Sequence, residues 1–205
     1  MSPLLVKMLG KKIEGGYMEV LEAIKTRRSI RNYKPTPVDD KAIELVLEAA
    51  RWAPSWANTQ CWEIIVVKDP EKKRALSSLL KPERNPARNA VANAPVVLAV
   101  CGRKGTSGYY RGRPVTEKGD WLMFDVALAV QNMALAVHAL GLGAVIVGAL
   151  DHRKASELLN IPEDVELVAL MPIGKPAAKP KTPPRKELDR FVFLDSYGNP
   201  LMFEG

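Results

Sequence analysis

The chain has 205 residues and a formal net charge of +7, and it is 47% hydrophobic and 26% charged. This composition is ordinary for a globular protein and allows one substantial hydrophobic core, so we expect a single domain. The basic balance permits an anionic ligand. Aromatic residues are few and scattered, and no zinc spacing or nucleic-acid motif appears, which argues against a nucleic-acid partner.

The cysteine and histidine residues suggest neither a disulfide framework nor a metal site. Cys61 and Cys101 form no C-x-x-C pair, and His138 and His152 lack neighbours of metal-ligand type. We therefore predict no metal ion and a reducing, cytoplasmic location. Cys61, at the start of a predicted strand, is expected to be buried rather than redox-active.

Residues 1–17 are predicted to be an amino-terminal extension of one domain formed by residues 18–205. The apolar run Leu4-Leu5-Val6 is shorter than the apolar region of a signal peptide. Export is therefore not expected.

The first predicted helix leads into a basic cluster. Apolar residues recur at helical spacing at Tyr17, Val20, Leu21 and Ile24. The helix ends near Arg27-Arg28-Ser29-Ile30-Arg31, where three guanidinium groups and a hydroxyl are close in sequence. Guanidinium groups suit phosphate or another oxyanion, although basic side chains also stabilise a helix C-terminus. The cluster is either an anion site or a solvated basic turn.

A second helix and a polar loop follow. The helix is expected to begin at Asp39 or Asp40. Its predicted buried stripe is Ile43, Val46, Leu47 and Ala50. The loop holds Ser55, Asn58 and Gln60 and precedes a predicted strand at 63–68. These side chains can offer donors and acceptors to a planar polar ligand, or they can satisfy the backbone of their own turn.

A charged helix is predicted from Asp69 to Leu80 and a second buried strand from Pro95 to Cys101. The segment Gly102–Gly119 then becomes glycine-rich and basic around Tyr109-Tyr110. Long connections without periodicity are often functional, so this segment is a candidate lid or substrate loop.

Residues 121–140 are apolar on nearly all sides. Asp125 and His138 argue against a membrane span, because ionisable groups are costly in lipid. We predict a central helix that is buried by the domain and by a second subunit, in which both polar side chains have hydrogen-bond partners.

Gly141-Leu142-Gly143 is expected to end that helix. The remaining predicted elements are a strand (144–149), a short helix (151–159) and a strand (165–173). In the first of these strands Gly148 would let a ligand approach the backbone. From Gly174 the tail is rich in proline and basic residues, including Lys181 and Arg185, and a solvated linker is the alternative to a ligand-binding segment.

Four features, in this order, resemble the FMN-dependent nitroreductase family over residues 18–198. They are the basic cluster at 27–31, the Ala53-Pro54-Ser55-x-x-Asn58-x-Gln60 loop, the Gly141–Gly143 break leading to Val147-Gly148, and Pro172-Ile173-Gly174 followed by a basic run with Arg185. Each feature is weak alone, and the order and spacing together make the match specific.

The resemblance implies an α+β fold with a mixed central sheet flanked by helices. It also implies a homodimer, with the long buried central helix at its interface and two FMN sites. By position, Arg27 and Ser29 would bind phosphate or ribityl groups, Arg28 would contribute through its backbone, and Arg185 would return from the tail to the same phosphate. Arg31 would lie near flavin N1 and O2.

In the same resemblance Ser55 and Asn58 would face the flavin ring from the partner chain, with Gln60 in the same loop. The backbone amides of Val147 and Gly148 would approach N5 and O4.

The implied activity is hydride transfer from NADH or NADPH, through flavin N5, to a nitroaromatic, quinone or related conjugated acceptor in a ping-pong cycle. No catalytic side chain is expected, because the hydride chemistry occurs on the cofactor, while Arg31 would stabilise negative charge near N1 of reduced flavin. Alternatives are the same fold with dehalogenation, dehydrogenation or flavin fragmentation, a flavin-holding dimer without turnover, and a basic nucleic-acid-binding module.

Overall fold

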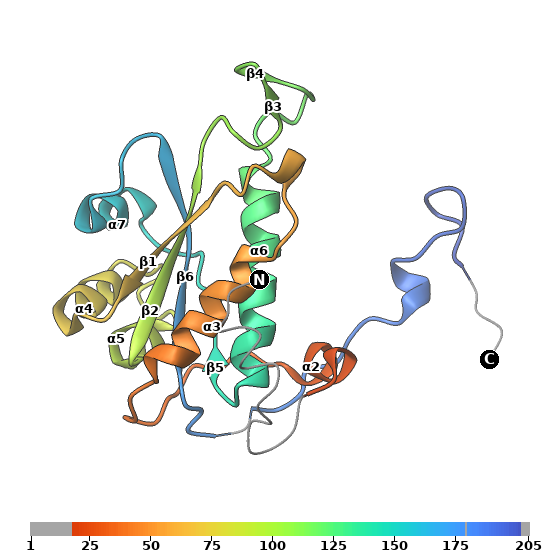
Figure 1. The fold of residues 1–205 in the computed structure, drawn as a ribbon. Helices are drawn as coiled ribbons and strands as arrows, with labels where there is room; N and C mark the ends of the chain where they lie inside the picture. Colours follow the sequence, from red (N-terminus) through yellow and green to blue (C-terminus); the bar gives the residue numbers. More distant parts are fainter. Residues whose placement is uncertain (1–17, 179, 202–205) are drawn as a thin grey trace.

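The computed structural model describes residues 18–178 and 180–201, so the predicted extension at 1–17 lies outside the described residues. Four strands form one sheet in the order β1-β2-β6-β5 (Figure 1). Their bounds are β1 Trp62–Val67, β2 Val96–Arg103, β6 Val165–Gly174 and β5 Gly143–Ala144. The three ladders are antiparallel, and a parallel bridge joins Ser29 to Ala144 at the sheet edge.

Helices cover both faces of the sheet (Figure 1). One face carries α3 (Asp40–Arg51) and α6 (Leu122–Ala139). The other carries α4 (Pro70–Ser78), α5 (Arg88–Asn93) and α7 (His152–Leu159). The short helix α2 (Val20–Thr26) packs against α6. This arrangement is the α+β fold with a helix-flanked sheet that the sequence predicted.

Helix α3 forms where the sequence predicted it. The Asp39 side chain accepts a hydrogen bond from the Lys41 amide at 3.0 Å and so caps the first turn. Ile43, Val46 and Ala50 are buried, which confirms three of the four positions of the predicted stripe, and Leu47 is partly buried against the same core.

Helix α6 is the central helix, and it buries one face. The buried residues are Leu122, Asp125, Val126, Ala129, Val130, Met133, Ala134 and Val137. On the opposite face Met123 and Phe124 are 53% and 57% exposed. By length and composition α6 could cross a membrane, a test that the core helix of a soluble protein also passes.

The strand predicted at 144–149 is shorter in the structure. Strand β5 pairs Gly143 with Gly174 and Ala144 with Ile173, and the next pairing is the isolated bridge between Val147 and Leu170. In this register Val145 faces Pro172, which has no N–H to donate. The ladder is therefore interrupted there and resumes beyond it.

Within the predicted lid segment the structure contains a small hairpin, β3 (Tyr109–Tyr110) and β4 (Arg113–Pro114). Its root packs on the amino-terminal end of α6, where Trp121 donates a backbone hydrogen bond to the Ser107 carbonyl at 3.0 Å. The segment thus has secondary structure that its glycine-rich sequence did not reveal.

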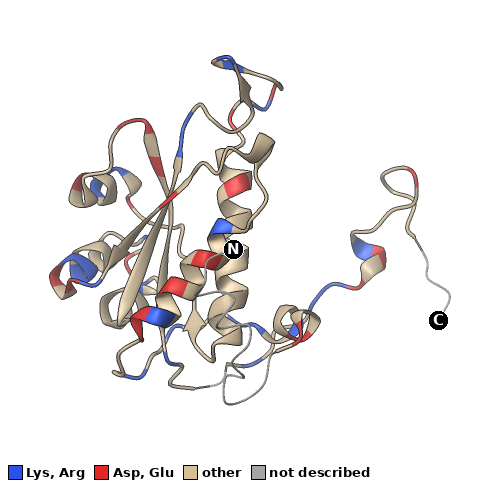
Figure 2. Cartoon of the chain, viewed as in Figure 1, with Lys and Arg blue, Asp and Glu red and all other residues tan. Residues whose placement is uncertain are grey.

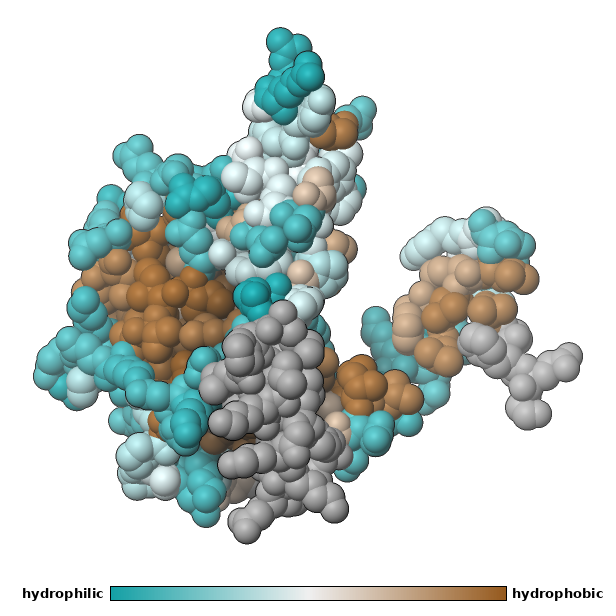
Figure 3. Space-filling view, viewed as in Figure 1, coloured by the Kyte–Doolittle hydropathy of each residue, from teal (hydrophilic) through white to brown (hydrophobic). Residues whose placement is uncertain are grey.

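The apolar face of α2 points away from the body of this chain. Val20, Leu21 and Ile24 are 61%, 66% and 50% exposed, and only Ala23 of this helix is buried. The tail carries further exposed apolar side chains, including Phe191, and both regions appear as hydrophobic surface in Figure 3.

Candidate active site

Basic side chains from both ends of the described chain converge on one cleft. Figure 2 shows basic residues at the end of α2 and in the tail segment that passes it. We call this the basic cleft. It is lined by Arg27, Arg28, Ser29, Arg31, Pro180, Lys181, Thr182, Pro183 and Arg185. The guanidinium groups of the arginines, the ammonium group of the lysine and the two hydroxyls are hydrogen-bond donors that fit a phosphate group.

The chain after α2 is held against the edge of the sheet. Ser29 bridges to Ala144, and the Ile30 amide donates to the Ala144 carbonyl at 2.9 Å. This close approach requires a glycine next to Ala144, because a Cβ at Gly143 would lie 2.5 Å from Ile30 Cγ1. The Gly141–Gly143 motif therefore has a packing role besides ending α6.

The tail is fastened beside the same segment. The Lys34 amide donates to the Lys175 carbonyl at 2.8 Å, and the Ala177 amide donates to the Asn32 carbonyl at 3.0 Å. These two bonds bring the chain that leads to Arg185 alongside the chain that follows Arg31.

The Arg28 side chain connects α2 to the tail. Its Nη1 donates to the carbonyls of Lys25 and Arg27, each at 2.7 Å, and its Nη2 donates to the Thr182 hydroxyl at 3.3 Å. Its Nε is buried without a partner among the described residues. Three of the five N–H donors of Arg28 thus bind the protein itself, while the ligand contact predicted for this residue is through its backbone.

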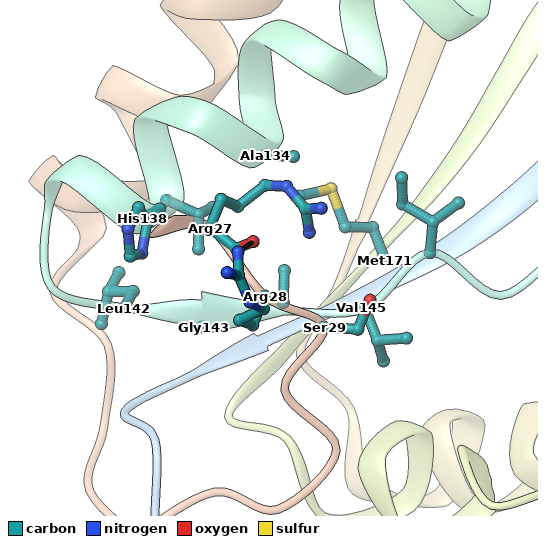
Figure 4. A pocket seen from close by; sticks show the side chains of 12 residues that line it. Arg27, Arg28, Ser29, Ala134, His138, Leu142, Gly143, Val145 and Met171 are labelled. Atoms are coloured by element: carbon teal, nitrogen blue, oxygen red, sulfur yellow. Dashed lines mark hydrogen bonds between the residues drawn. The ribbon is translucent and has the colours of Figure 1, made fainter. Parts of the chain in front are cut away.

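Arg27, Arg28 and Ser29 also line a second, inner hollow against α6 and the sheet. Its other lining residues are Ala134, Val137, His138, Leu142, Gly143, Ala144, Val145, Ile146 and Met171. In Figure 4 the Arg27 side chain runs along this hollow toward Met171, while His138 and Leu142 lie at the opposite end. The basic cleft thus adjoins a part-apolar hollow, the combination that a phosphate attached to a flat organic group needs.

His138 is part of this site, although the sequence suggested only that it would have a hydrogen-bond partner. Its Nε2 lies 2.8 Å from the Thr26 hydroxyl, whose own proton is donated to the Glu22 carbonyl at 2.6 Å. His138 Nε2 must then carry the proton of this hydrogen bond. Burial, with the charges of Arg27 and Arg28 beside it, lowers the pKa of His138 and favours the neutral ring.

The predicted loop residues Ser55, Asn58 and Gln60 lie at the other end of α6. The Gln60 amide donates to the Ser55 hydroxyl at 2.9 Å, and Gln60 Nε2 donates to the Asn58 side-chain oxygen at 3.1 Å. Side chains of this loop therefore make hydrogen bonds within the loop itself, one of the two roles that the sequence suggested for them. Asn58 and Gln60 are exposed, so both side chains remain accessible to a ligand.

Val147 and Gly148 lie at the sheet edge near the inner hollow. The Val147 amide donates to the Leu170 carbonyl at 2.9 Å, so in this chain it is already engaged. No backbone carbonyl among the described residues accepts a hydrogen bond from the exposed Gly148 amide. Of the two amides predicted to approach the flavin, that of Gly148 is free to do so.

Both cysteines are free and buried. Burial raises the pKa of the Cys61 thiol to about 11, with Asp125 adding to the shift, and raises that of Cys101 to about 12. Neither thiol is activated as a nucleophile. Within the described residues no three His, Cys, Asp or Glu side chains form a group that could hold a metal ion.

Thr182 and His138 are polar residues of the basic cleft and its hollow that the sequence did not single out as site residues. Thr182 gave no signal beyond its place in the basic tail, and His138 was assigned to the core or an interface. Only the packing of α2 between α6 and the tail shows that both belong to the site.

Comparison with known proteins identifies the family. The profile described as the nitroreductase family matches residues 24–175. A Methanothermobacter thermautotrophicus protein named "Putative NADH dehydrogenase/NAD(P)H nitroreductase" is 37% identical over 80% of this chain and 81% of its own length. A 5,6-dimethylbenzimidazole synthase from Rhodobacter capsulatus is 30% identical over 79% of this chain and 86% of its own length.

The fold agrees with this match. The crystal structure of a nitroreductase family protein from Clostridium novyi NT superposes with a TM-score of 0.71 and 28% identity, over 89% of this chain and 97% of that one. The predicted resemblance is confirmed: the chain belongs to the FMN-dependent nitroreductase family of NAD(P)H oxidoreductases.

Proposed function

We propose that this oxidoreductase binds FMN in the basic cleft and inner hollow, and that it reduces a nitroaromatic, quinone or related conjugated acceptor in a ping-pong cycle. The observation that carries the proposal is the convergence of Arg27 and Arg185, from opposite ends of the chain, on one cleft. When bound, FMN supplies the hydride chemistry, taking hydride from NADH or NADPH and delivering it to the acceptor.

The residues of the chain bind and orient the cofactor. Arg27, Ser29 and Arg185 hold the phosphate, because charge-assisted hydrogen bonds from arginine are the strongest that side chains offer it. Arg31, exposed at the rim of the cleft, supplies a cation near N1 and so favours the reduced state. The backbone of Arg28 and the Gly148 amide complete the polar contacts from this chain.

The active form in this proposal is a cytoplasmic homodimer. Helix α6 has 18 residues and is about 27 Å long, and it separates the loop at 55–60 from the basic cleft of the same chain. A second copy that places its own loop over the cleft would bring Ser55, Asn58 and Gln60 to the ring. The exposed apolar faces of α2, α6 and the tail provide surface for such a copy to bury.

The test is direct. The purified protein should be yellow with flavin absorbance, and NADH or NADPH under argon should bleach it, with colour returning on addition of an acceptor. Colourless protein that fails to bind added FMN would refute the proposal, and a yellow protein that resists bleaching would be an inert flavin holder. Sedimentation should show an FMN-loaded dimer, and a stable loaded monomer would contradict the shared site.

A second reaction on the same site is supported by the relative named 5,6-dimethylbenzimidazole synthase. This alternative reaction uses the same FMN site but gives a different product. Incubation of the reduced protein with oxygen, followed by mass spectrometry, separates the two: flavin that is lost as dimethylbenzimidazole appears favours the synthase, and intact flavin favours the reductase.

A further inference from the structure

One buried carboxylate, that of Asp125, binds two separate segments at the amino-terminal end of α6. Its Oδ2 accepts a hydrogen bond from the Trp56 amide at 3.0 Å and another from the Ser107 hydroxyl at 2.6 Å. Asp125 is 1% exposed and Ser107 is fully buried. A buried carboxylate of this kind is stable only with its hydrogen bonds intact, because an ion without partners is costly to desolvate.

The first segment is the loop at 55–60, which has an unusual backbone. Ala57, Asn58 and Gln60 have φ values of 44°, 58° and 49°, a left-handed conformation that residues other than glycine adopt only when their surroundings hold them there. Among the described residues, the bond from Trp56 to Asp125 is the one hydrogen bond that links residues 55–60 to the rest of the chain.

The second segment is the hairpin region, residues 104–119. Its root is fixed by the Ser107 hydroxyl on Asp125 and by the Trp121 amide, which donates to the Ser107 carbonyl. The Trp121 ring, just after this region at the start of α6, lies 5.4 Å from the Trp56 ring, centroid to centroid, so the same tryptophan contacts both the hairpin root and the loop. Gly108 is required at this root, because a Cβ there would lie 2.4 Å from Trp121 Cδ1.

We propose that Asp125 is a positioning residue that couples the loop at 55–60 to the hairpin region at 104–119, so that the fit of the electron acceptor depends on this carboxylate. The inference rests on the proposed function, in which the loop carries flavin contacts, and on the sequence-based prediction that the segment containing the hairpin is a lid or substrate loop. Because one oxygen, Asp125 Oδ2, accepts hydrogen bonds from both segments, a change in either segment alters the hydrogen bond that holds the other.

The coupling is tested first without cofactor or turnover. Hydrogen exchange of the full chain is compared for wild type, Ser107→Ala, Asp125→Asn and Asp125→Ala. Ser77→Ala is the control, since Ser77 is also buried and donates to a carbonyl, that of Arg88 at 2.9 Å, on the other face of the sheet.

We expect Ser107→Ala to speed amide exchange about tenfold or more, not only in 104–119 but also at Trp56, which shares the Asp125 oxygen with Ser107 without a hydrogen bond to it. Asp125→Asn, whose oxygen can still accept, should lie between wild type and Asp125→Ala in both segments. Faster exchange confined to 104–119 in Ser107→Ala would overturn the coupling.

The second readout is the split between KM and kcat. With a bulky quinone and a small nitroaromatic compound as probes, Ser107→Ala should raise KM several-fold for the bulky acceptor, with little change in kcat or in the half-reaction with NADH. Equal effects on both acceptors, or on neither, would overturn the role in acceptor fit. If the wild type binds no FMN, the proposed function fails, while the exchange experiment still decides the coupling.

Discussion

The Arg28 guanidinium and the Thr182 hydroxyl are 3.3 Å apart, although 154 positions separate the two residues in sequence. This hydrogen bond joins the end of α2 to the tail, three positions before Arg185. The proposed phosphate site therefore depends on a contact between segments that are brought together only by folding.

We expect Thr182→Val to weaken FMN binding about 3- to 10-fold, the range for one hydrogen bond of ordinary strength, because the tail that carries Arg185 loses a tether. Thr182→Ser keeps the hydroxyl and should bind as wild type does. Fluorescence titration of the apoprotein measures both Kd values. Equal affinities in the two variants would show that this bond does not hold the tail.

Removal of a phosphate contact should have a larger effect. Arg27→Ala and Arg185→Ala should each weaken FMN binding about 10- to 150-fold, since a charge-assisted hydrogen bond contributes roughly 1.5–3 kcal/mol. Arg153→Ala removes an exposed arginine on α7 and serves as the control. The same titration applies, and unchanged affinity in both variants would show that the phosphate binds elsewhere.

Two glycines near the site should respond differently to alanine. Gly143→Ala should lower the free energy of unfolding by about 1–3 kcal/mol, because the new methyl group overlaps Ile30. At Gly148 the nearest atom to an added Cβ is the Val168 carbonyl oxygen at 3.9 Å, so Gly148→Ala should change stability little.

Gly148→Ala should nevertheless weaken FMN binding if the flavin approaches this backbone. Urea unfolding of the apoprotein and FMN titration separate the two effects. A Gly143→Ala variant as stable as wild type would show that Ile30 can move away from the sheet edge.

His138 should make the apoprotein sensitive to acid. Its pKa is lowered in the fold from the ordinary 6.5, so below that pH the unfolded chain binds more protons and the fold loses stability as the pH falls. At higher pH the His138 ring is neutral in both the folded and the unfolded state, so it adds nothing to the pH dependence of the stability.

The measurement is the difference in Tm between wild type and His138→Gln from pH 7.5 to pH 5, with His152→Gln as the matched histidine control. The wild type should lose more stability on acidification than His138→Gln, and bound FMN should reduce the loss, because a phosphate beside Arg27 favours a charged imidazole. Parallel curves for wild type and His138→Gln would contradict the assignment.

Local signals in the sequence predicted most of the elements. Asp39 caps α3 and Asp151 caps α7, at the predicted starts of these two helices. The 3.6-residue spacing of Ile43, Val46 and Ala50 predicted the buried face of α3. These predictions succeed because a cap and a helical stripe depend on residues within one or two turns of each other.

Predictions were less complete where the structure depends on contacts between residues far apart in the sequence. The short ladder of β5 follows from Pro172 on the neighbouring strand β6. The apolar stripe of α2 is exposed because none of the residues at 18–178 and 180–201 covers it. The hairpin at 109–114 was missed because its glycine-rich sequence carries no strand periodicity.

The sequence by itself determined the family, the order of most helices and strands, and the arginines suited to a phosphate, because these depend on short motifs and on the order and spacing of those motifs. Only the tertiary structure decided that Arg28 and Thr182 join the two ends of the chain, that His138 adjoins Arg27, and that Asp125 anchors two loops at once. Those contacts join residues far apart in the chain, and their hydrogen bonds exist only after the sheet and α6 have packed.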